Sequence, residues 1–283
     1  KKKKPFYGRV YISIKPVAGA TLTETTKTDI INKLKEFNVA SITPIIQDPE
    51  TTSVQLTVSV KYDAKSTTKT ADSIKALVTS AITDFNTNNL QEFDSIFRHS
   101  KFIETINKVD NSVLSNITTV KLHKSFTAVT TGSTTYTVGF NNALYNPHSG
   151  HNASGGGILT SSGFKISGDA TNEYFLDEDG AGNVRLYYLV GTTRTYSNSS
   201  QGTINYATGV VTINSLNITS VSNVDGATST AVRLTVIPSS VDVIPVRNQV
   251  LEIDEANTTV SVSADTYDTT SGIGYTSATS YAS

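Results

Sequence analysis

Residues 8–63 read GRVYISIKPVAGATLTETTKTDIINKLKEFNVASITPIIQDPETTSVQLTVSVKYD, and this stretch decides the fold because every local pattern in it agrees. Apolar and polar residues alternate at 10–14, 42–46 and 54–60, which is the pattern of half-buried strands. The last two runs are separated by turn-forming residues at 48–51. We therefore expect these two strands to pair as a hairpin.

Between the first two strands, the spacing of apolar residues changes from two to about 3.6, which indicates a helix. Apolar residues from Ile30 to Phe37 form its inward stripe. Thr21 and Glu24 fit the T-x-x-E capping box that satisfies free backbone donors at a helix start. The stretch therefore predicts the order strand, helix, strand, strand.

A second helix is predicted over Ile74–Phe85, where apolar residues recur at spacings of three and four. A helical patch follows at Phe93–Ile106, with Ser100 as a capping residue, and Val120–Leu122 indicates a closing strand. The resulting order β-α-β-β-α-α-β is typical of a split βαβ domain that carries its helices on one sheet face. We assign residues 1–122 to this domain.

From residue 123 the helical spacing disappears, and short alternating runs bounded by Gly, Asn, Asp and Ser replace it. This pattern predicts a β-rich domain, a small sandwich or barrel, over residues 123–240. The turn sequences Asp177–Asn183 and Ala207–Gly209 each lie between two such runs and predict hairpins. The fold class is therefore α+β: a split βαβ domain, an all-β domain and an extended tail.

Residues 241–283 have little core of their own. Two strand-like pieces flank Pro245, and from residue 264 the composition is too polar to offset the cost of ordering the backbone. We therefore expect this segment to lie against a partner. The predicted interface residues are Val243, Val246, Val250, Ile253, Tyr267, Tyr275 and Tyr281. The alternative is that Val243–Ile253 simply closes its own domain.

Composition excludes several functional classes. With 23 basic and 24 acidic residues the chain has no global field to hold nucleic acid. The exception to this balance of charge is the run of four lysines at Lys1–Lys4. It can be interpreted as a solvated run or as a phosphate-binding arm. The chain has no cysteine, hence neither disulfides nor a thiolate site, and no apolar run approaches the roughly 18 residues of a membrane helix. It also has no methionine, so we expect residue 1 to lie within a longer protein.

Two groups of side chains could in principle hold a metal. His148 and His151 lie close in sequence, but no third ligand is identifiable and the loop is glycine-rich, which favours a solvated loop. Residues 177–183 resemble part of a calcium loop, but Tyr188 occupies the twelfth position, where an EF-hand needs glutamate. A charged hairpin turn is the favoured interpretation, and we predict no metal and no cofactor.

No motif for catalysis is present. Gly155–Gly157 lacks the lysine and following helix of a phosphate loop, and there is no G-x-S-x-G elbow. His99 is interpreted as a surface residue, and His123 lies at a domain junction without an evident nucleophile. Paired carboxylates for glycoside hydrolysis depend on separations that only the fold sets. We predict that the protein is not an enzyme.

Several long stretches resemble the C-terminal part of the T-even-type phage baseplate wedge protein family, gene product six. The resemblance is carried by GRVYISIKP and LTETTK, by NVASITPIIQDPET and VSVKYD, and by EFDSIFRHSKFIETINKVDNSVLSNITTVKLHK. IPSSVDVIPVRNQVLEID adds to it near the end of the chain, and GTINYATGVVTI is a weaker link. It covers roughly residues 6–126 and 236–254, and the region 127–235 is the least defined part.

The resemblance implies a structural role in the virion. Members of this family join adjacent wedges into a six-fold ring around the tail hub, and the ring rearranges when the sheath contracts. The implied partners are a second copy of the chain and other wedge proteins, with hub or sheath-initiating proteins as further candidates. Assembly would take place in the host cytoplasm, and neither nucleic acid nor membrane is an expected partner.

Two other classes remain open. The β-rich region exposes aromatic candidates at Tyr187, Tyr188 and Tyr196 among many Thr, Ser, Asn and Gly residues, which is compatible with a glycan-binding or host-adhesion module. A baseplate hydrolase would require a cleft with a perturbed pair of acids.

Overall fold

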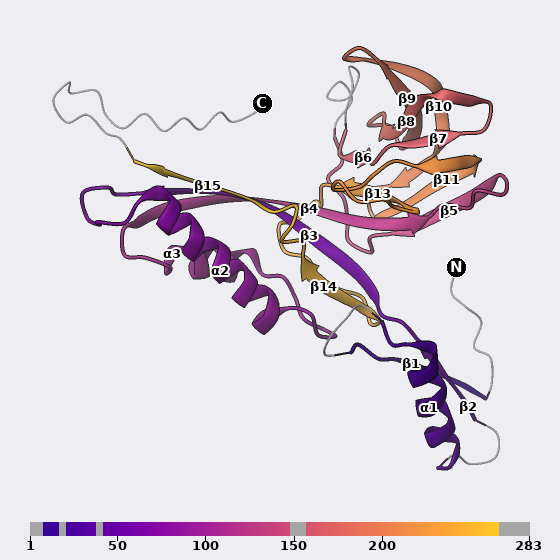
Figure 1. Ribbon diagram of the computed structural model, residues 1–283, viewed down its shortest axis with the longest axis horizontal. Coiled ribbons are helices and arrows are strands. Elements are labelled where there is room, and N and C mark those ends of the chain that lie inside the picture. The colour runs from indigo at the N-terminus through magenta and orange to yellow at the C-terminus, as the bar shows by residue number, and fades with distance from the viewer. Residues whose placement is uncertain (1–7, 17–20, 38–41, 148–156, 266–283) are drawn as a thin grey trace.

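The computed structural model describes residues 8–16, 21–37, 42–147 and 157–265 (Figure 1). The described part is elongated. A small unit of two strands and one helix lies at one end, a helix-covered sheet lies at the other, and a second sheet stands beside the middle (Figure 1). The α+β class agrees with this architecture, although the pairing of the strands differs from the expected one.

The small unit consists of β1 (Arg9–Ser13), α1 (Glu24–Lys35) and β2 (Thr43–Gln47), with β1 and β2 paired in parallel. The hairpin expected between β2 and the next strand is wrong, because β2 pairs with β1 instead. The expected capping box is also wrong: Thr23 is the N-cap, and its side chain accepts a hydrogen bond from the Thr26 amide. The helix has no buried residue, so its stripe is only half covered.

Two long strands form the centre of the molecule. β3 (Glu50–Tyr62) and β4 (Val113–Thr127) run antiparallel, and we call this pair the central ladder. Every second residue of β3 from Val54 to Tyr62 is buried, as the alternation in sequence predicts. The seven strand and helix patterns expected up to residue 122 occur in that order along the chain, but they do not form one sheet.

Helices α2 (Ala71–Asn89) and α3 (His99–Asn107) cover one face of the central ladder (Figure 1). Three aromatic rings, Phe85, Phe97 and Phe102, lie within 5.3–6.1 Å of one another beneath them. The helical patch expected from residue 93 is wrong at its start. Gln91 and Asp94 both have φ of 66°, which interrupts a helix before α3 begins.

The C-terminal segment runs alongside the first domain. β14 (Gln249–Ile253) pairs in parallel with the beginning of β3, and β15 (Thr259–Ala264) pairs in parallel with its end. These strands and the central ladder are joined by β13 (Ala231–Val236) and β6 (Leu159–Ser161). The result is a six-stranded sheet of order β14-β3-β4-β13-β6, with β15 also on β3.

A seven-stranded sheet of order β12-β7-β8-β9-β10-β11-β5 forms most of the region that was expected to be all-β, while β6 and β13 of that region belong to the six-stranded sheet. Both predicted hairpins are confirmed, because β8 pairs with β9 and β10 pairs with β11, in each case antiparallel. The strand bounds are β5 Thr134–Gly139, β6 Leu159–Ser161, β7 Phe164–Ile166, β8 Asp169–Glu178, β9 Asn183–Val190, β10 Thr193–Asn205, β11 Val210–Leu216, β12 Ile218–Val221 and β13 Ala231–Val236.

The two sheets share one continuous core because β4 takes part in both regions. Residues 113–123 of β4 pair with β3, and residues 122–127 pair with β13. Phe126 of β4 packs against Tyr136 of β5, with ring centroids 4.4 Å apart. Lys124 is buried beside them, where its ammonium pairs with Glu50 and donates a 2.7 Å hydrogen bond to the Gly139 carbonyl. The expected domain boundary at residues 122 and 123 lies inside β4.

Candidate functional site

The chain between β13 and β14, residues 237–248, contains the first of the predicted interface residues, and we call it the connecting segment. Asp242 holds it to α3: one carboxylate oxygen accepts the His99 amide at 2.8 Å and the other accepts from the Arg98 guanidinium at 2.9 Å. These hydrogen bonds, the amide first, lower the pKa of Asp242 below its usual range. Ser100, expected to cap α3, therefore does not do so; a carboxylate from a distant segment does.

The buried side of the connecting segment is anchored through Val243. Its backbone exchanges two 3.0 Å hydrogen bonds with Phe97, and its side chain is fully buried. Val250 and Ile253, in β14, are also buried, at 1% and 4% exposure. Three of the four valine and isoleucine side chains predicted to contact a partner are therefore covered by their own chain. This is what the alternative interpretation expected of the segment.

The opposite side of the connecting segment carries an apolar surface that faces solvent. Val246, the fourth predicted residue, is 39% exposed, and Val241 and Ile244 are 48% and 52% exposed. The Asn142 side chain fixes Ile244 by accepting its amide hydrogen and donating to its carbonyl, each at 3.1 Å. A rigidly held row of exposed aliphatic side chains can bind another protein surface. Alternation in the sequence could have indicated Val241 and Ile244, but it does not say which side is covered.

Tyr267, Tyr275 and Tyr281 lie outside the described residues, as do Lys1–Lys4, His148 and His151. The tail tyrosines therefore remain predicted contact residues.

His123 lies in a cluster that joins three parts of the described chain. Its Nε2 is 2.6 Å from Oδ2 of Asp254, which follows β14. The Asn257 amide donates to Asp254 at 2.7 Å and to Asp225 at 2.9 Å, and Arg233 of β13 forms a bidentate ion pair with Asp225. We call these five residues the junction cluster. It lines a pocket of about 460 Å³.

The electrostatics of the junction cluster favour structure over chemistry. Burial lowers the pKa of His123, and this effect outweighs the opposing attraction of Asp254. The Arg233 and Asn257 hydrogen bonds lower the pKa of Asp225. Among the described residues, the hydrogen-bond partner of the His123 ring is Asp254 and not a hydroxyl nucleophile. The cluster therefore joins three segments that are distant in sequence.

The acidic turn at residues 177–183 uses its carboxylates internally. Glu178 accepts the Ile158 amide at 3.0 Å and the Tyr206 hydroxyl at 2.7 Å. Asp179 accepts the amides of Ala181 and Asn183 at 2.8 and 3.0 Å. Since the chain's own donors occupy these oxygens, the geometry is that of a hairpin turn and not of an open calcium loop.

Tyr187 and Tyr196 lie on one face of the seven-stranded sheet, and Tyr188 points to the other face, where it contacts Tyr174. The guanidinium of Arg194 lies 4.8 Å from the Tyr187 ring centroid, and that of Arg185 lies 4.3 Å from the Tyr196 centroid. Both arginines also pair with the buried carboxylate of Asp177. Two of the three tyrosines thus use a ring face for an internal cation–π contact and do not form an open platform for sugar.

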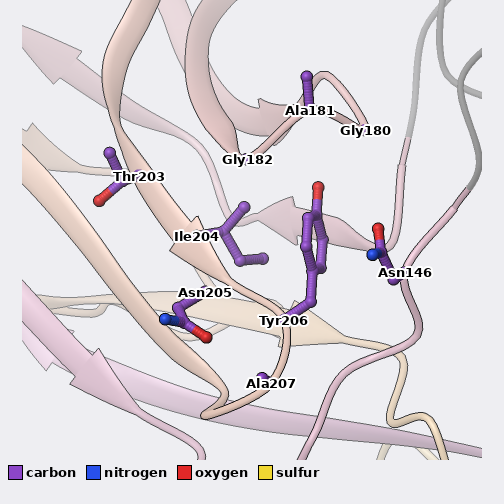
Figure 2. Close-up of a pocket in the computed structure, with 9 residues that line it drawn as sticks. All are labelled: Asn146, Gly180, Ala181, Gly182, Thr203, Ile204, Asn205, Tyr206 and Ala207. Atoms are coloured by element: carbon purple, nitrogen blue, oxygen red, sulfur yellow. The ribbon is translucent and has the colours of Figure 1, made fainter.

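A second pocket, of about 540 Å³, lies at the end of the same sheet (Figure 2). It is lined by the Gly180–Gly182 turn, by residues 203–207 and by Asn146, with the Tyr206 ring between the turn and Asn146 (Figure 2). Its charged neighbour Glu178 is hydrogen bonded to the Tyr206 hydroxyl. The pocket thus presents a mixed lining of backbone, small polar groups and the apolar side chains of Ile204 and Tyr206.

Two kinds of feature are absent from the described residues. Groups of three or more His, Asp or Glu side chains that could hold a metal are not found in this part of the chain. None of the helices in it has the length and apolar character needed to cross a membrane.

Comparison with known proteins gives two family matches and a relative. Residues 1–47 match the C-terminal domain I of the baseplate structural protein gp6, and residues 50–125 match C-terminal domain III of the same protein. Baseplate wedge protein gp6 of Enterobacteria phage T4 is 28% identical over 115 residues, which are 41% of this chain and 17% of the relative. The chain thus spans a small fraction of the length of that relative. Residues 1–47 and 50–125 of the chain are therefore similar to the C-terminal portion of the gp6 family of baseplate structural proteins.

Proposed function

We propose that the chain is a structural subunit of a contractile phage tail baseplate wedge. In this role it contacts a second copy of itself and neighbouring wedge proteins in a six-fold ring around the tail hub, and the ring rearranges when the sheath contracts. The observation that carries the proposal is the pair of gp6 domain matches, which cover both the small β1–α1–β2 unit and the central ladder.

The architecture supports a mechanical role. The central ladder is formed by strands of 13 and 15 residues and connects the small unit to the helix-covered end and to the seven-stranded sheet. Strand ladders of this length can transmit position because main-chain hydrogen bonds recur at every second residue pair along them. The surfaces at both ends are therefore fixed relative to each other, as a subunit of a ring requires.

The polar clusters also support a structural and non-enzymatic role. In the described part of the chain, the carboxylates at residues 177–179 and the junction cluster are paired with the chain's own donors. A catalytic site would instead leave a base or nucleophile directed into a cleft. The role proposed for these groups is to join segments that are distant in sequence.

The connecting segment is the contact surface that we propose for assembly. Val241, Ile244 and Val246 are exposed, while the backbone beneath them is held by Phe97, α3 and Asn142. A short aliphatic row of this kind suits a moderate interface. Moderate interfaces repeated by symmetry can hold a ring together and still allow it to rearrange.

Incorporation into tails tests the proposal. The double variant Ile244→Asp and Val246→Asp places two charges on the exposed side and leaves the buried anchor Val243 intact. Val190→Asp is the matched control, since Val190 is 61% exposed on the seven-stranded sheet. We expect phage particles to contain the wild-type and control chains in their baseplates and to lack the double variant. Equal incorporation of all three would contradict the proposed contact surface, and absence of the wild-type chain from baseplates would contradict the proposed role.

A further inference from the structure

β15 forms an open edge of the six-stranded sheet. It lies at the outer margin of the helix-covered end (Figure 1), and among the described residues its strand partner is β3, on its inner side. The amide of Asp265 donates to the Tyr62 carbonyl at 2.8 Å, so the main-chain groups of odd-numbered residues are directed to β3. In a strand the direction alternates, and the N–H and C=O groups of Val260 and Val262 are therefore directed away from β3.

By contrast, the outward main-chain groups of β14, which also pairs with β3, have hydrogen-bond partners. The Leu251 carbonyl accepts the Gln91 amide at 2.9 Å, and the Ile253 amide donates to the Asn86 side chain at 2.9 Å. Phe93 forms a further bridge to Val250. Within the described residues, the outward groups of β15 have no comparable partner.

β15 also lacks the features that protect an edge strand. Its sequence, Thr-Val-Ser-Val-Ser-Ala, contains no charged residue and no proline, and its register with β3 is unbroken. Exposed edges without such features are templates for pairing with a further strand. A pocket of about 240 Å³ lies between α2 and the beginning of β15, lined by Lys75 and Thr79 on the helix and by Thr259 and Val260 on the strand.

The composition of β15 favours a second copy of this strand as the partner. Val260, Val262 and Ala264 are half-buried toward α2, while Thr259, Ser261 and Ser263 face solvent. Antiparallel pairing about a two-fold axis places the aliphatic residues opposite aliphatic residues and the hydroxyl residues opposite hydroxyl residues. Cross-strand pairs of these kinds stabilise a sheet, and the pairing brings no like charges together.

We propose that β15 pairs antiparallel with β15 of a second copy, so that two six-stranded sheets become one continuous sheet across a dimer axis. This inference rests on the proposed function in that it assigns a surface to the contact between copies. The interface is short and would bury less area than a standard stable complex, so it forms a dimer that dissociates on dilution.

Sedimentation velocity of the 283-residue chain over a micromolar concentration series tests the pairing. Val262→Pro removes an outward N–H and leaves the hydrogen bonds to β3 in place, since proline is tolerated where an edge N–H faces outward. We expect the wild-type chain to dimerise and the proline variant to bind roughly tenfold more weakly or not at all. Val262→Thr keeps the N–H and is the matched control, which should dimerise as the wild type does.

Cysteine cross-linking gives an independent measurement, including the case in which the proline variant fails to fold. The chain has no cysteine, so single variants Ser261→Cys and Ser263→Cys, alone and mixed, report contact at β15 without ambiguity. Ser200→Cys, exposed on β10, is the control and should not cross-link.

A dimer unaffected by Val262→Pro, a wild-type chain that stays monomeric, or absence of β15 cross-links would overturn the inference. The tail-incorporation experiment is separate, because a chain that enters baseplates without pairing at β15 would leave the proposed function standing.

Discussion

Phe97 and Val243 exchange two main-chain hydrogen bonds, from each amide to the other's carbonyl, both of 3.0 Å. Phe97 immediately precedes the start of α3, and Val243 belongs to the connecting segment far along the chain. This exchange joins the last part of the chain to the first domain. It also determines which side of the connecting segment remains exposed.

Val243→Ala should destabilise the protein, because the side chain is fully buried and its loss leaves a cavity. We expect the free energy of unfolding to fall by about 1.5–3 kcal/mol, measured by urea denaturation. Val246→Ala is the matched control three residues away, and we expect a change within about 0.5 kcal/mol because this side chain is exposed. Equal losses of unfolding free energy for the two variants would contradict the assignment of Val243 to the buried side of the connecting segment and of Val246 to the exposed side.

Acidification should weaken the folded state through His123. Burial lowers its pKa in the folded protein, so the unfolded chain, with a histidine pKa of about 6.5, binds the proton more readily. The contribution of His123 to stability is therefore retained above pH about 6.5 and is lost progressively as the pH falls below that value. Urea unfolding from pH about 7.5 to about 5 should show a smaller loss for His123→Gln than for the wild type. Identical losses would exclude His123 as a source of the pH dependence.

Asn86 should contribute to the attachment of β14 to α2. Its side-chain oxygen accepts the buried Ile253 amide at 2.9 Å, and its amide group donates to Glu255 at 2.9 Å. Asn86→Ala leaves the buried backbone amide of Ile253 without an acceptor, and we expect the free energy of unfolding to fall by about 1–3 kcal/mol. Hydrogen exchange should also accelerate at Ile253. Thr87→Ala, next along the helix and exposed, should leave both quantities nearly unchanged, and exchange at Ile253 that matches the wild type would argue against this role for Asn86.

Asp177 should be required for the stability of the seven-stranded sheet. Its fully buried carboxylate accepts from Arg185 at 2.9 Å, from Arg194 at 2.7 Å and from the Tyr196 hydroxyl at 3.0 Å. Asp177→Asn leaves the largely buried Arg185 without its counter-charge, and we expect a loss of about 3–5 kcal/mol in thermal or urea unfolding. Asp84→Asn, exposed on α2, is the control. If the free energy of unfolding fell by less than about 1 kcal/mol, the ion pairs of Arg185 and Arg194 with Asp177 would be screened by solvent and not buried.

Local patterns in the sequence predicted the positions of helices and strands better than they predicted which strands pair with each other. The alternation from Val54 to Val60 and the helical spacing from Ile74 to Phe85 are confirmed in β3 and α2. The same alternation could not show that β2 pairs with β1, because period-two patterning fixes the face of a strand and not its partner. The positive φ angles at Gln91 and Asp94, which interrupt the expected helix, occur at residues other than glycine and leave little trace in sequence.

The predicted interface residues differ in exposure. Val246, a predicted contact residue, is exposed, whereas Val243, Val250 and Ile253 are buried in their own chain. Both sides of the connecting segment are aliphatic, and hydropathy alone therefore cannot tell the inner side from the outer. The side is decided by Asp242 and Asn142, whose partners are distant in sequence.

Electron cryomicroscopy of the intact phage tail would show whether this chain is a ring subunit of the baseplate. We expect density for this chain in the baseplate, repeated about the six-fold axis around the hub, with the connecting segment against a neighbouring protein. Density for the chain elsewhere on the tail, or a baseplate in which Val241, Ile244 and Val246 face solvent in every copy, would contradict it.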